Sequence, residues 1–236
     1  MCIRDSAYFG LYGIGIARYE ISTNSWLPTW TEYSNSPSGN AILDPGNQDV
    51  TGLVADINPN QLWIGGEDGF QLIDVTTGAE VYDIEKSSNL YLGNGEPYQM
   101  VIYNDVMYYH QGDDSNSVYR IDVANFQELS NIDAGIQLDD NSGPAWGIGL
   151  IDGIIMASVA SNDGFPDYYD GQGGIAQWDI ANDTWGENIE PSGQVDRVTA
   201  YEATNGDMWV SWGELRLDLY DSAGNFVDSW NDDDGL

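Results

Sequence analysis

The chain has 236 residues, of which 39 are Asp or Glu and 6 are Lys or Arg, so its formal net charge at pH 7 is −33. Nucleic acids and anionic lipid surfaces attract clustered cations, so this charge excludes both as electrostatic partners. With 42% apolar and 12% aromatic residues the chain can fill a core, which excludes a disordered polymer. A single cysteine, Cys2, and a single histidine, His110, exclude a disulfide framework and a Cys/His zinc site.

The acidic residues are biased towards Asp, with 28 Asp against 11 Glu, and Lys86 is the only lysine. Because Asp favours turns and Glu favours helices, this bias predicts a chain rich in turns and poor in helices. A surface with so few cations suits a saline setting, where salt screens self-repulsion; the alternative is that the carboxylates bind divalent cations. The two interpretations are compatible.

The two ends of the sequence differ from the rest. Residues 1–6 resemble a translated adaptor remnant at the start of a metagenomic reading frame, so we interpret them as an artefact that carries no fold information. Residues 231–236 form a short acidic tail, which we interpret as truncated. On this interpretation the chain is a fragment, and a signal peptide would have been lost with the true N-terminus.

A repeat of about 50 residues organises everything in between. Five segments share an apolar strand, an acidic residue, a short turn and a second strand, with the acids at Glu20, Asp74, Asp122, Asp179 and Asp221. A period of this length with strand signals alone is typical of four-stranded propeller blades. The sequence therefore predicts an all-β fold, a β-propeller of four-stranded antiparallel blades, with about five blades present in an incomplete ring.

In chain order the predicted blades cover about 7–33, 50–85, 98–133, 144–190 and 196–230. The first is predicted to lack its inner strand and to keep 7–13, 15–21 and 26–32. The other four are each predicted to have four strands: 50–57, 62–66, 69–75 and 80–85; 98–103, 106–111, 117–123 and 126–132; 146–151, 154–160, 173–180 and 184–189; 197–203, 208–212, 215–220 and 226–230.

The repeated acid and the repeated aromatic residues are both explained by structure. An Asp at the end of a third strand can accept hydrogen bonds from the amides of the following tight turn, so we interpret it as a cap rather than as a metal ligand. The recurrent Trp and Tyr residues are expected to pack between blades. A carbohydrate-binding aromatic platform is the alternative.

The predicted connections are unequal. Turns between first and second strands and between third and fourth strands are tight, whereas the other connections are long: 33–49, 86–97, 133–144 and 161–172. Since long loops escape the constraints of the core, the sequence predicts that this long-loop side is the working surface.

Candidate site residues lie in two of these long connections. Asp163, Asp167 and Asp170 could supply oxygen ligands to Ca²⁺, although their spacing is not that of a twelve-residue calcium loop. Tyr168 and Tyr169 could contact a glycan or a peptide, and Asp139 and Asp140 are placed on the same side. A solvated loop without a ligand is the alternative for both.

The sequence contains few residues of the kinds that catalytic sites require. His110 falls within a predicted second strand, where a structural histidine is expected, and no Ser-His-Asp or Cys-His set is available. The piece Trp146-Gly-Ile-Gly149 lacks the Gly-Lys and the helix of a phosphate loop, so we interpret it as an inner strand. No catalytic residue is predicted.

The second repeat resembles a known family. The segment Leu62-Trp-Ile-Gly-Gly-Glu-Asp-Gly-Phe-Gln-Leu-Ile-Asp-Val-Thr-Thr-Gly78 is similar to the repeat of the ligand-binding sensor propellers of two-component regulators. Residues 208–213 and 173–180 match parts of the same pattern. The resemblance implies a β-propeller with a sensing role.

The sequence thus favours a non-catalytic propeller outside the cytoplasm, either extracellular, periplasmic or on the cell surface, that binds a protein, glycan or small molecule through its long-loop side. Ca²⁺ is the one cofactor expected. A carboxylate-dependent propeller glycosidase or lyase is one alternative, and a structural module of a larger surface protein is another. Five repeats are fewer than in common closed rings, so exposed blade faces are also expected.

Overall fold

The computed structural model describes residues 2–3, 6–11, 13–31, 50–66, 69–85, 97–111, 117–133, 142–161, 174–186, 198–202, 207–212, 216–221 and 225–231. These residues form strands and turns, and no helix occurs among them. In the same residues no helix is long and apolar enough to span a membrane. The predicted all-β class is confirmed.

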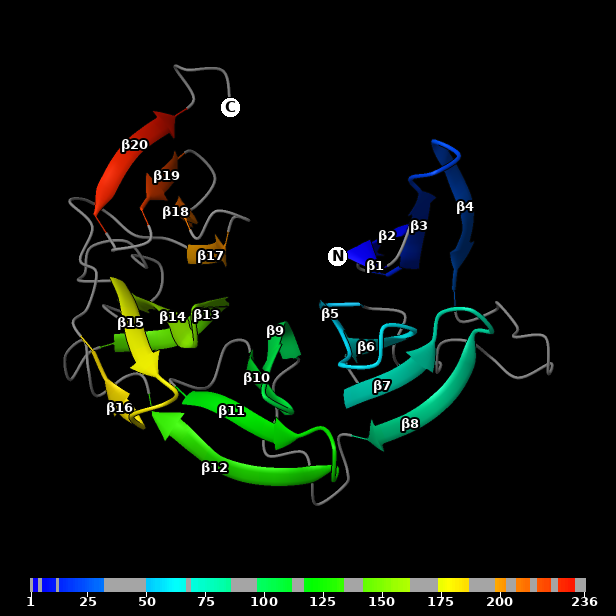
Figure 1. Cartoon of the computed structure of the whole chain (residues 1–236), viewed down its shortest axis with the longest axis horizontal. Coiled ribbons are helices and arrows are strands. Elements are labelled where there is room, and N and C mark those ends of the chain that lie inside the picture. Colours follow the sequence, from blue (N-terminus) through cyan, green and yellow to red (C-terminus); the bar gives the residue numbers. More distant parts are fainter. Residues whose placement is uncertain are drawn as a thin grey trace. The chain divides into compact units, whose positions relative to one another are not determined.

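The strands form five four-stranded antiparallel sheets, each hydrogen-bonded in simple chain order (Figure 1). We call these sheets blades 1 to 5. Blade 1 is β1 (Cys2–Ile3), β2 (Ser6–Leu11), β3 (Gly15–Glu20) and β4 (Ser25–Trp30); blade 2 is β5 (Gly52–Ala55), β6 (Gln61–Gly66), β7 (Gly69–Asp74) and β8 (Ala79–Glu85); blade 3 is β9 (Pro97–Tyr103), β10 (Val106–Gln111), β11 (Ser117–Asp122) and β12 (Gln127–Asp133); blade 4 is β13 (Ser142–Ile151), β14 (Ile154–Ser161), β15 (Gly174–Asp179) and β16 (Thr184–Trp185); blade 5 is β17 (Val198–Glu202), β18 (Met208–Trp212), β19 (Arg216–Tyr220) and β20 (Phe226–Asn231).

These are blades of a β-propeller, as the repeat predicted. Strand bounds agree with the sequence prediction to within a few residues; β10 and β18 agree at both ends. The difference lies in blade 1, for which three strands were predicted. The two residues of β1 pair with β2, Cys2 opposite Ala7 and Ile3 opposite Ser6, so the sheet has a short fourth strand.

The chain divides into two compact units: residues 1–109 with 120–129, and residues 110–119 with 130–236. The first unit contains blades 1 and 2 and most of blade 3, and the second contains blades 4 and 5. Each unit is held together by apolar side chains between neighbouring blades.

In the first unit, blade 1 packs on blade 2 through one apolar layer. Tyr8, Ile16 and Trp30 of blade 1 meet Leu62, Ile64 and Ile73 of blade 2, and all six are buried. The blades approach closely, because a Cβ placed on Gly10 would lie 2.7 Å from Cγ1 of Val50, just before β5. On its other side blade 2 packs on blade 3, where the rings of Phe70 and Tyr109 meet edge to face at 4.7 Å.

In the second unit, blade 4 packs on blade 5 in the same manner. Met156 and Ile175 of blade 4 meet Met208, Val210 and Tyr220 of blade 5 in a buried cluster. Asp218 lies on the same side of blade 5 as Val210 and Tyr220, and it is fully buried. Its carboxylate accepts two hydrogen bonds from Arg216, at 2.8 and 2.7 Å.

A blade that lies between two others, such as blade 2, therefore has two faces with different partners. We call the face that packs on the preceding blade the upstream face, such as Leu62, Ile64 and Ile73 in blade 2. The opposite face, which packs on the following blade, is the downstream face, such as Tyr8, Ile16 and Trp30 in blade 1. Because side chains alternate along a strand, the two faces have separate sets of residues.

Candidate functional site

The residues predicted to form a site lie outside the described residues. This holds for the proposed calcium ligands Asp163, Asp167 and Asp170, for Tyr168 and Tyr169, and for Asp139 and Asp140. Their prediction as site residues is therefore not tested by the structure. What it does describe is the strands from which these segments start and to which they return.

The turns and connections of each sheet lie at the two ends of its strands. We call the end that carries the tight turns the turn edge, and the opposite end the connection edge. In an antiparallel sheet in chain order, the first-to-second and third-to-fourth turns lie at one edge, and all other connections lie at the opposite edge. At the turn edge, the link between β9 and β10 is two residues, Asn104 and Asp105, and the link between β13 and β14 is Asp152 and Gly153. At the connection edge of blade 4, twelve residues separate β14 from β15, and these include all five candidates at 163–170.

The hairpins at the turn edge have the backbone that their sequences predict. Asn104 and Asp105 have φ angles of 50° and 63°, and Asp152 and Gly153 have 48° and 80°. Two consecutive residues with positive φ make the mirror-image turn that matches the twist of a hairpin. Asn, Asp and Gly tolerate this conformation best, which explains why they occur here.

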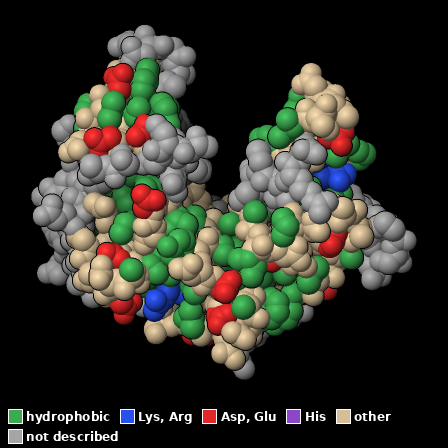
Figure 2. Space-filling model, viewed as in Figure 1, with side chains coloured by type: hydrophobic (Ala, Val, Ile, Leu, Met, Phe, Trp, Pro, Cys, Tyr) green, Lys and Arg blue, Asp and Glu red, His purple; other side chains and the backbone are tan. Residues whose placement is uncertain are grey.

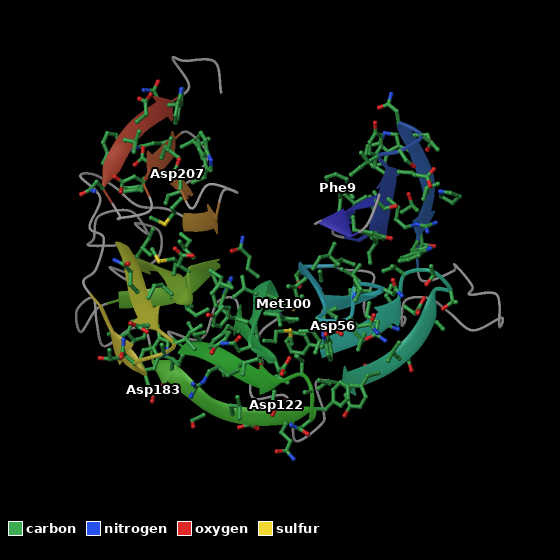
Figure 3. All side chains as sticks on the ribbon, viewed as in Figure 1. Phe9, Asp56, Met100, Asp122, Asp183 and Asp207 are labelled. Atoms are coloured by element: carbon green, nitrogen blue, oxygen red, sulfur yellow. The ribbon has the colours of Figure 1, made fainter. Side chains whose placement is uncertain are left out.

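Four of the five repeated acids, all of them Asp, cap the turns that follow them, as expected, whereas the fifth, Glu20, accepts a hydrogen bond from the hydroxyl of Thr23. Asp74 accepts hydrogen bonds from the amides of Thr76 and Thr77, both at 2.9 Å. Asp122, labelled in Figure 3 near the β11–β12 turn, does the same for Ala124 and Asn125 at 3.0 and 2.9 Å. The equivalent acids Asp179 and Asp221 accept from the amides of the next turns, Ala181, Asn182 and Asn225.

This capping lowers the pKa of three of these carboxyls. The hydroxyl of Thr76 holds the pKa of Asp74 below its usual value, with help from the amides of Thr76 and Thr77. The side-chain amides of Asn125 and Asn182 lower the pKa of Asp122 and Asp179 in the same way. Each donor stabilises the charged form, so these carboxylates are occupied by their own turns rather than held ready for a ligand.

Within the described ranges, no three His, Cys, Asp or Glu side chains come close enough together to hold a metal ion. Acidic side chains are scattered over the visible face of the space-filling view (Figure 2). The capping role of the repeated acids accounts for their periodicity without a repeated metal site.

Two features that could have suggested catalysis lie within strands. His110 is fully buried in β10. Gly147 and Gly149 lie within β13, the inner strand of blade 4, and pair with Ser158 and Met156 of β14. The glycine-rich piece is therefore an inner strand, as the sequence predicted.

An exposed aromatic cluster on blade 1 is the feature that the sequence prediction missed. Trp26 of β4 is 65% exposed and packs on Phe9 and Tyr19, with ring centroids 5.7 and 5.1 Å away. Sequence periodicity predicted that such aromatics pack between blades, as Phe70 and Tyr109 do. It could not show that these three have no described blade against them, because a strand pattern does not state which face is covered.

No protein-family model matches the chain, and no curated protein matches it either. Solved structures do match. One is the extracellular domain of the hybrid two-component system BT3049 from B. thetaiotaomicron, with a TM-score of 0.61 and 13% sequence identity. The match covers 95% of this chain and 27% of that one, so this chain spans about a quarter of its length. The likeness agrees with the family resemblance in the second repeat and shows that the two proteins share a fold.

Proposed function

We propose that this chain is part of a non-catalytic extracytoplasmic propeller that binds a protein, glycan or small molecule at the connection edges of its blades. The observation that carries the proposal is the contrast between the two edges. At the turn edge the repeated carboxylates are bound to their own turn amides, whereas the connection edge carries the long segments with Asp139, Asp140, Tyr168 and Tyr169. Long segments on a rigid scaffold are where binding residues concentrate.

The structural likeness supports the sensing class. The matched protein is named as the extracellular domain of a hybrid two-component system, and we extend the sensing class to this chain. A similar location for this chain agrees with its acidic, lysine-poor composition. The likeness and the composition support the extracellular or periplasmic location that we propose.

A binding experiment tests this function. Soluble oligosaccharides and short peptides are titrated into the wild-type chain and into the double variant Tyr168→Ala/Tyr169→Ala, with tryptophan fluorescence and calorimetry as readouts. We expect at least one probe to bind and the variant to lose about tenfold or more in affinity, since each buried aromatic contact contributes on the order of 1 kcal/mol or more. Asp139→Asn/Asp140→Asn is measured alongside.

The matched control is Phe226→Ala, which removes an exposed aromatic ring at the turn edge of blade 5. It is expected to bind as the wild type does. If the control and the Tyr168→Ala/Tyr169→Ala variant lose affinity equally, the connection edge is not the binding surface. If no probe binds, the structural-module interpretation is favoured instead.

Calcium is the cofactor that we propose for the same edge. Asp163, Asp167 and Asp170 lie within eight residues of one another, and carboxylate oxygens are the ligands that Ca²⁺ prefers. We expect millimolar CaCl₂ to raise the unfolding temperature relative to EGTA at equal ionic strength. With Ca²⁺ about a thousandfold above its dissociation constant, linkage predicts about 4 kcal/mol of stabilisation.

The variant Asp163→Asn/Asp167→Asn/Asp170→Asn should lose this calcium response. Glu128→Gln, which neutralises one exposed carboxylate on β12, should keep it. An equal response in the three proteins would show that Ca²⁺ acts on the general negative charge rather than at these residues.

A further inference from the structure

Blade 5 buries an ion pair close to its connection edge, between Arg216 and Asp218. Asp218 is fully buried on the upstream face, and its carboxylate accepts hydrogen bonds from Nε and Nη2 of Arg216 at 2.8 and 2.7 Å. Arg216 is the first residue of β19, which follows the connection from β18, so it lies at the connection edge. An apolar pair of similar volume would stabilise the blade about as well as a buried ion pair does. The presence of the charges therefore needs an explanation other than stability.

Both members of the pair depart from the repeat. The first residue of the third strand is glycine or serine in blades 1 to 4, and the residue two positions later is uncharged in those blades. The equivalents are Gly15, Gly69, Ser117 and Gly174 for Arg216, and Ala17, Gln71, Tyr119 and Ala176 for Asp218. A departure from the repeat pattern that adds no stability is expected at a functional position.

The guanidinium of Arg216 has donors that Asp218 does not use. An arginine side chain has five N–H donors, and two of them point to the carboxylate, so three remain on Nη1 and Nη2. These three have no hydrogen-bond partner among the described residues, and the side chain is 34% exposed. Asp218 thus fixes one edge of the planar group, and the edge formed by Nη1 and Nη2 remains able to donate to a ligand.

This second guanidinium edge belongs to the surface at which we propose ligand binding. The upstream face of blade 5 packs on blade 4, and both blades lie in the same compact unit. Arg216 shares that face with Asp218, because residues two apart in a strand point to the same side. The connection edge of blade 4 carries residues 162–173, which include Tyr168 and Tyr169. The placement of Arg216 therefore depends on blades 4 and 5 alone.

Charge decides which ligand group suits this edge. Two parallel N–H donors can bind the two oxygens of a carboxylate or the oxygens of two adjacent hydroxyl groups. Asp218 already balances the charge of Arg216, and the whole chain has a net charge of −33. A carboxylate ligand would be repelled by this charge without an unpaired cation to offset the repulsion, whereas an uncharged ligand is not repelled.

We propose that Arg216, held in place by Asp218, binds two adjacent hydroxyl groups of an uncharged ligand at the connection edge of blade 5. The inference rests on the proposed function and adds to it a binding residue and a preference for uncharged over acidic ligands. Asp218 is a positioning residue, because it contacts Arg216 and not the ligand. The adjacent hydroxyls can belong to a sugar ring or to an open-chain polyol.

Calorimetry on the whole chain with matched probes tests the proposal. Maltotriose, cellotriose and sorbitol offer adjacent hydroxyls without charge, and trigalacturonate offers them together with carboxylates. In about 0.15 M NaCl we expect at least one uncharged probe to bind the wild type more tightly than trigalacturonate does. Binding of a trisaccharide but not of sorbitol would assign the hydroxyls to a sugar ring, and the converse would assign them to a polyol.

Two variants of Arg216 remove the paired donors. Arg216→Lys keeps a positive charge beside Asp218 but replaces the planar group with a single ammonium, and we expect affinity for the uncharged probe to fall about tenfold or more. Arg216→Met/Asp218→Leu removes both charges together, so it should fold with near wild-type stability and lose affinity to the same extent. Arg18→Lys is the matched control, because it makes the same chemical change in blade 1; it should bind as the wild type does.

A third variant separates ligand selection from a structural role. Asp218→Leu leaves the guanidinium with an unbalanced charge. The affinity for trigalacturonate should then rise relative to that for the uncharged probe by about threefold or more, as expected for one unit charge at about 7 Å in water. A pair that only stabilises the fold would leave this ratio unchanged. Circular dichroism and urea denaturation verify that each variant is folded.

Four results would overturn the proposal. They are Arg216 variants that bind the uncharged probe as tightly as the wild type, a wild type that prefers trigalacturonate, an unchanged ratio in Asp218→Leu, and a wild type that binds none of the uncharged probes. The first three leave the proposed function standing, since a ligand still binds. After the fourth, the proposed function stands if a peptide binds and Tyr168→Ala/Tyr169→Ala weakens that binding; otherwise both fail.

Discussion

Blades 2 and 5 have the same register but treat one buried position differently. In the third strand of blade 2 this position is Gln71, opposite Ile64, and in blade 5 it is Asp218, opposite Val210. Both are fully buried polar side chains on an upstream face, next to an apolar cluster. Both blades thus bury a polar side chain between blades, but they differ in how that side chain is hydrogen-bonded.

In blade 5 the buried Asp218 carboxylate pairs with a counterion on the same strand. Arg216 precedes Asp218 by two residues, so the period of a strand places both side chains on one face. Its guanidinium donates two hydrogen bonds to the carboxylate, and this contact raises the pKa of Arg216 above its ordinary value. Burial raises the pKa of Tyr220, and the charge of Asp218 adds to that effect. Each carboxylate oxygen of Asp218 therefore accepts a hydrogen bond from a positively charged partner.

Blade 2 leaves its polar group half satisfied. The amide nitrogen of Gln71 donates to Glu80 at 3.3 Å, while its Oε1 is buried and has no hydrogen-bond partner in the described part of the chain. A neutral amide can be tolerated in this state, because an unpaired buried carbonyl costs on the order of 1–3 kcal/mol and an unpaired carboxylate costs more. The comparison indicates that a charged side chain is buried at this position between blades only where a residue of the same strand, such as Arg216, pairs with it.

The largest expected effect comes from separating the pair in blade 5. Arg216→Met leaves the Asp218 carboxylate buried and alone, and breaking such a pair typically costs about 3–5 kcal/mol. Arg216 is about one-third exposed, so we expect the lower end, about 3 kcal/mol, in the free energy of unfolding from urea denaturation.

The matched variants make this result specific. Asp218→Leu should cost much less, because the remaining guanidinium can reach water. The double variant Arg216→Met/Asp218→Leu should lie near the wild type, since an apolar pair of similar volume replaces the ion pair. Equal losses in all three proteins would mean that packing volume, not charge matching, decides the stability of this layer.

A smaller effect of opposite sign is expected in blade 2. Gln71→Leu removes the unpaired Oε1 and keeps a side chain of similar volume next to Ile64 and Ile73. The weak bond to Glu80 is lost, but Glu80 is exposed and regains water. We expect stabilisation of about 1 kcal/mol, measured by the same urea denaturation.

Gln71→Ala is the control for this variant. It also removes the unpaired oxygen but opens a cavity, so it should destabilise the chain. A Gln71→Leu protein that is less stable than the wild type would show that the amide has a partner in solution, and the contrast with Asp218 would then disappear.

The repeat made much of this fold predictable. Strand positions followed from alternating apolar residues and from turn signals, and the capping role of Asp74, Asp122 and Asp179 followed from their place at a strand end. These are local properties, set by neighbouring residues in the chain. The same locality explains why the resemblance in residues 62–78 was visible in the sequence.

The particular residues that meet between blades could not be predicted in this way. Gln71 and Asp218 were not singled out, because a polar residue within a strand gives no sign of burial or of its partner. The match of Arg216 with Asp218 depends on which face packs on the preceding blade, a property of the assembled structure. The exposure of Phe9 and Trp26 is likewise a property of how the sheets assemble and not of neighbouring residues in the chain. The candidate residues at 139–140 and 163–170 stay predictions, since they lie outside the described part of the chain.

The smallest expected effect concerns the turn of blade 2, where a carboxylate is matched by amides and hydroxyls rather than by a cation. The pKa of Asp74 is lowered in the folded state, chiefly by the hydroxyl of Thr76. Its stabilising contribution is therefore present above the unfolded pKa, about 3.9, and is lost as the pH falls through the lower folded value. We expect Asp74→Asn to lower the free energy of unfolding by about 1 kcal/mol or less at pH 7, since the site is exposed, and by less still near pH 3.

Urea denaturation of both proteins at the two pH values measures the difference. Glu128→Gln is the control, because Glu128 is an exposed carboxylate that caps no turn among the described residues. If the Asp74→Asn cost were the same at both pH values, the carboxylate charge would not be what stabilises the turn, and only the buried pair of blade 5 would depend on charge matching.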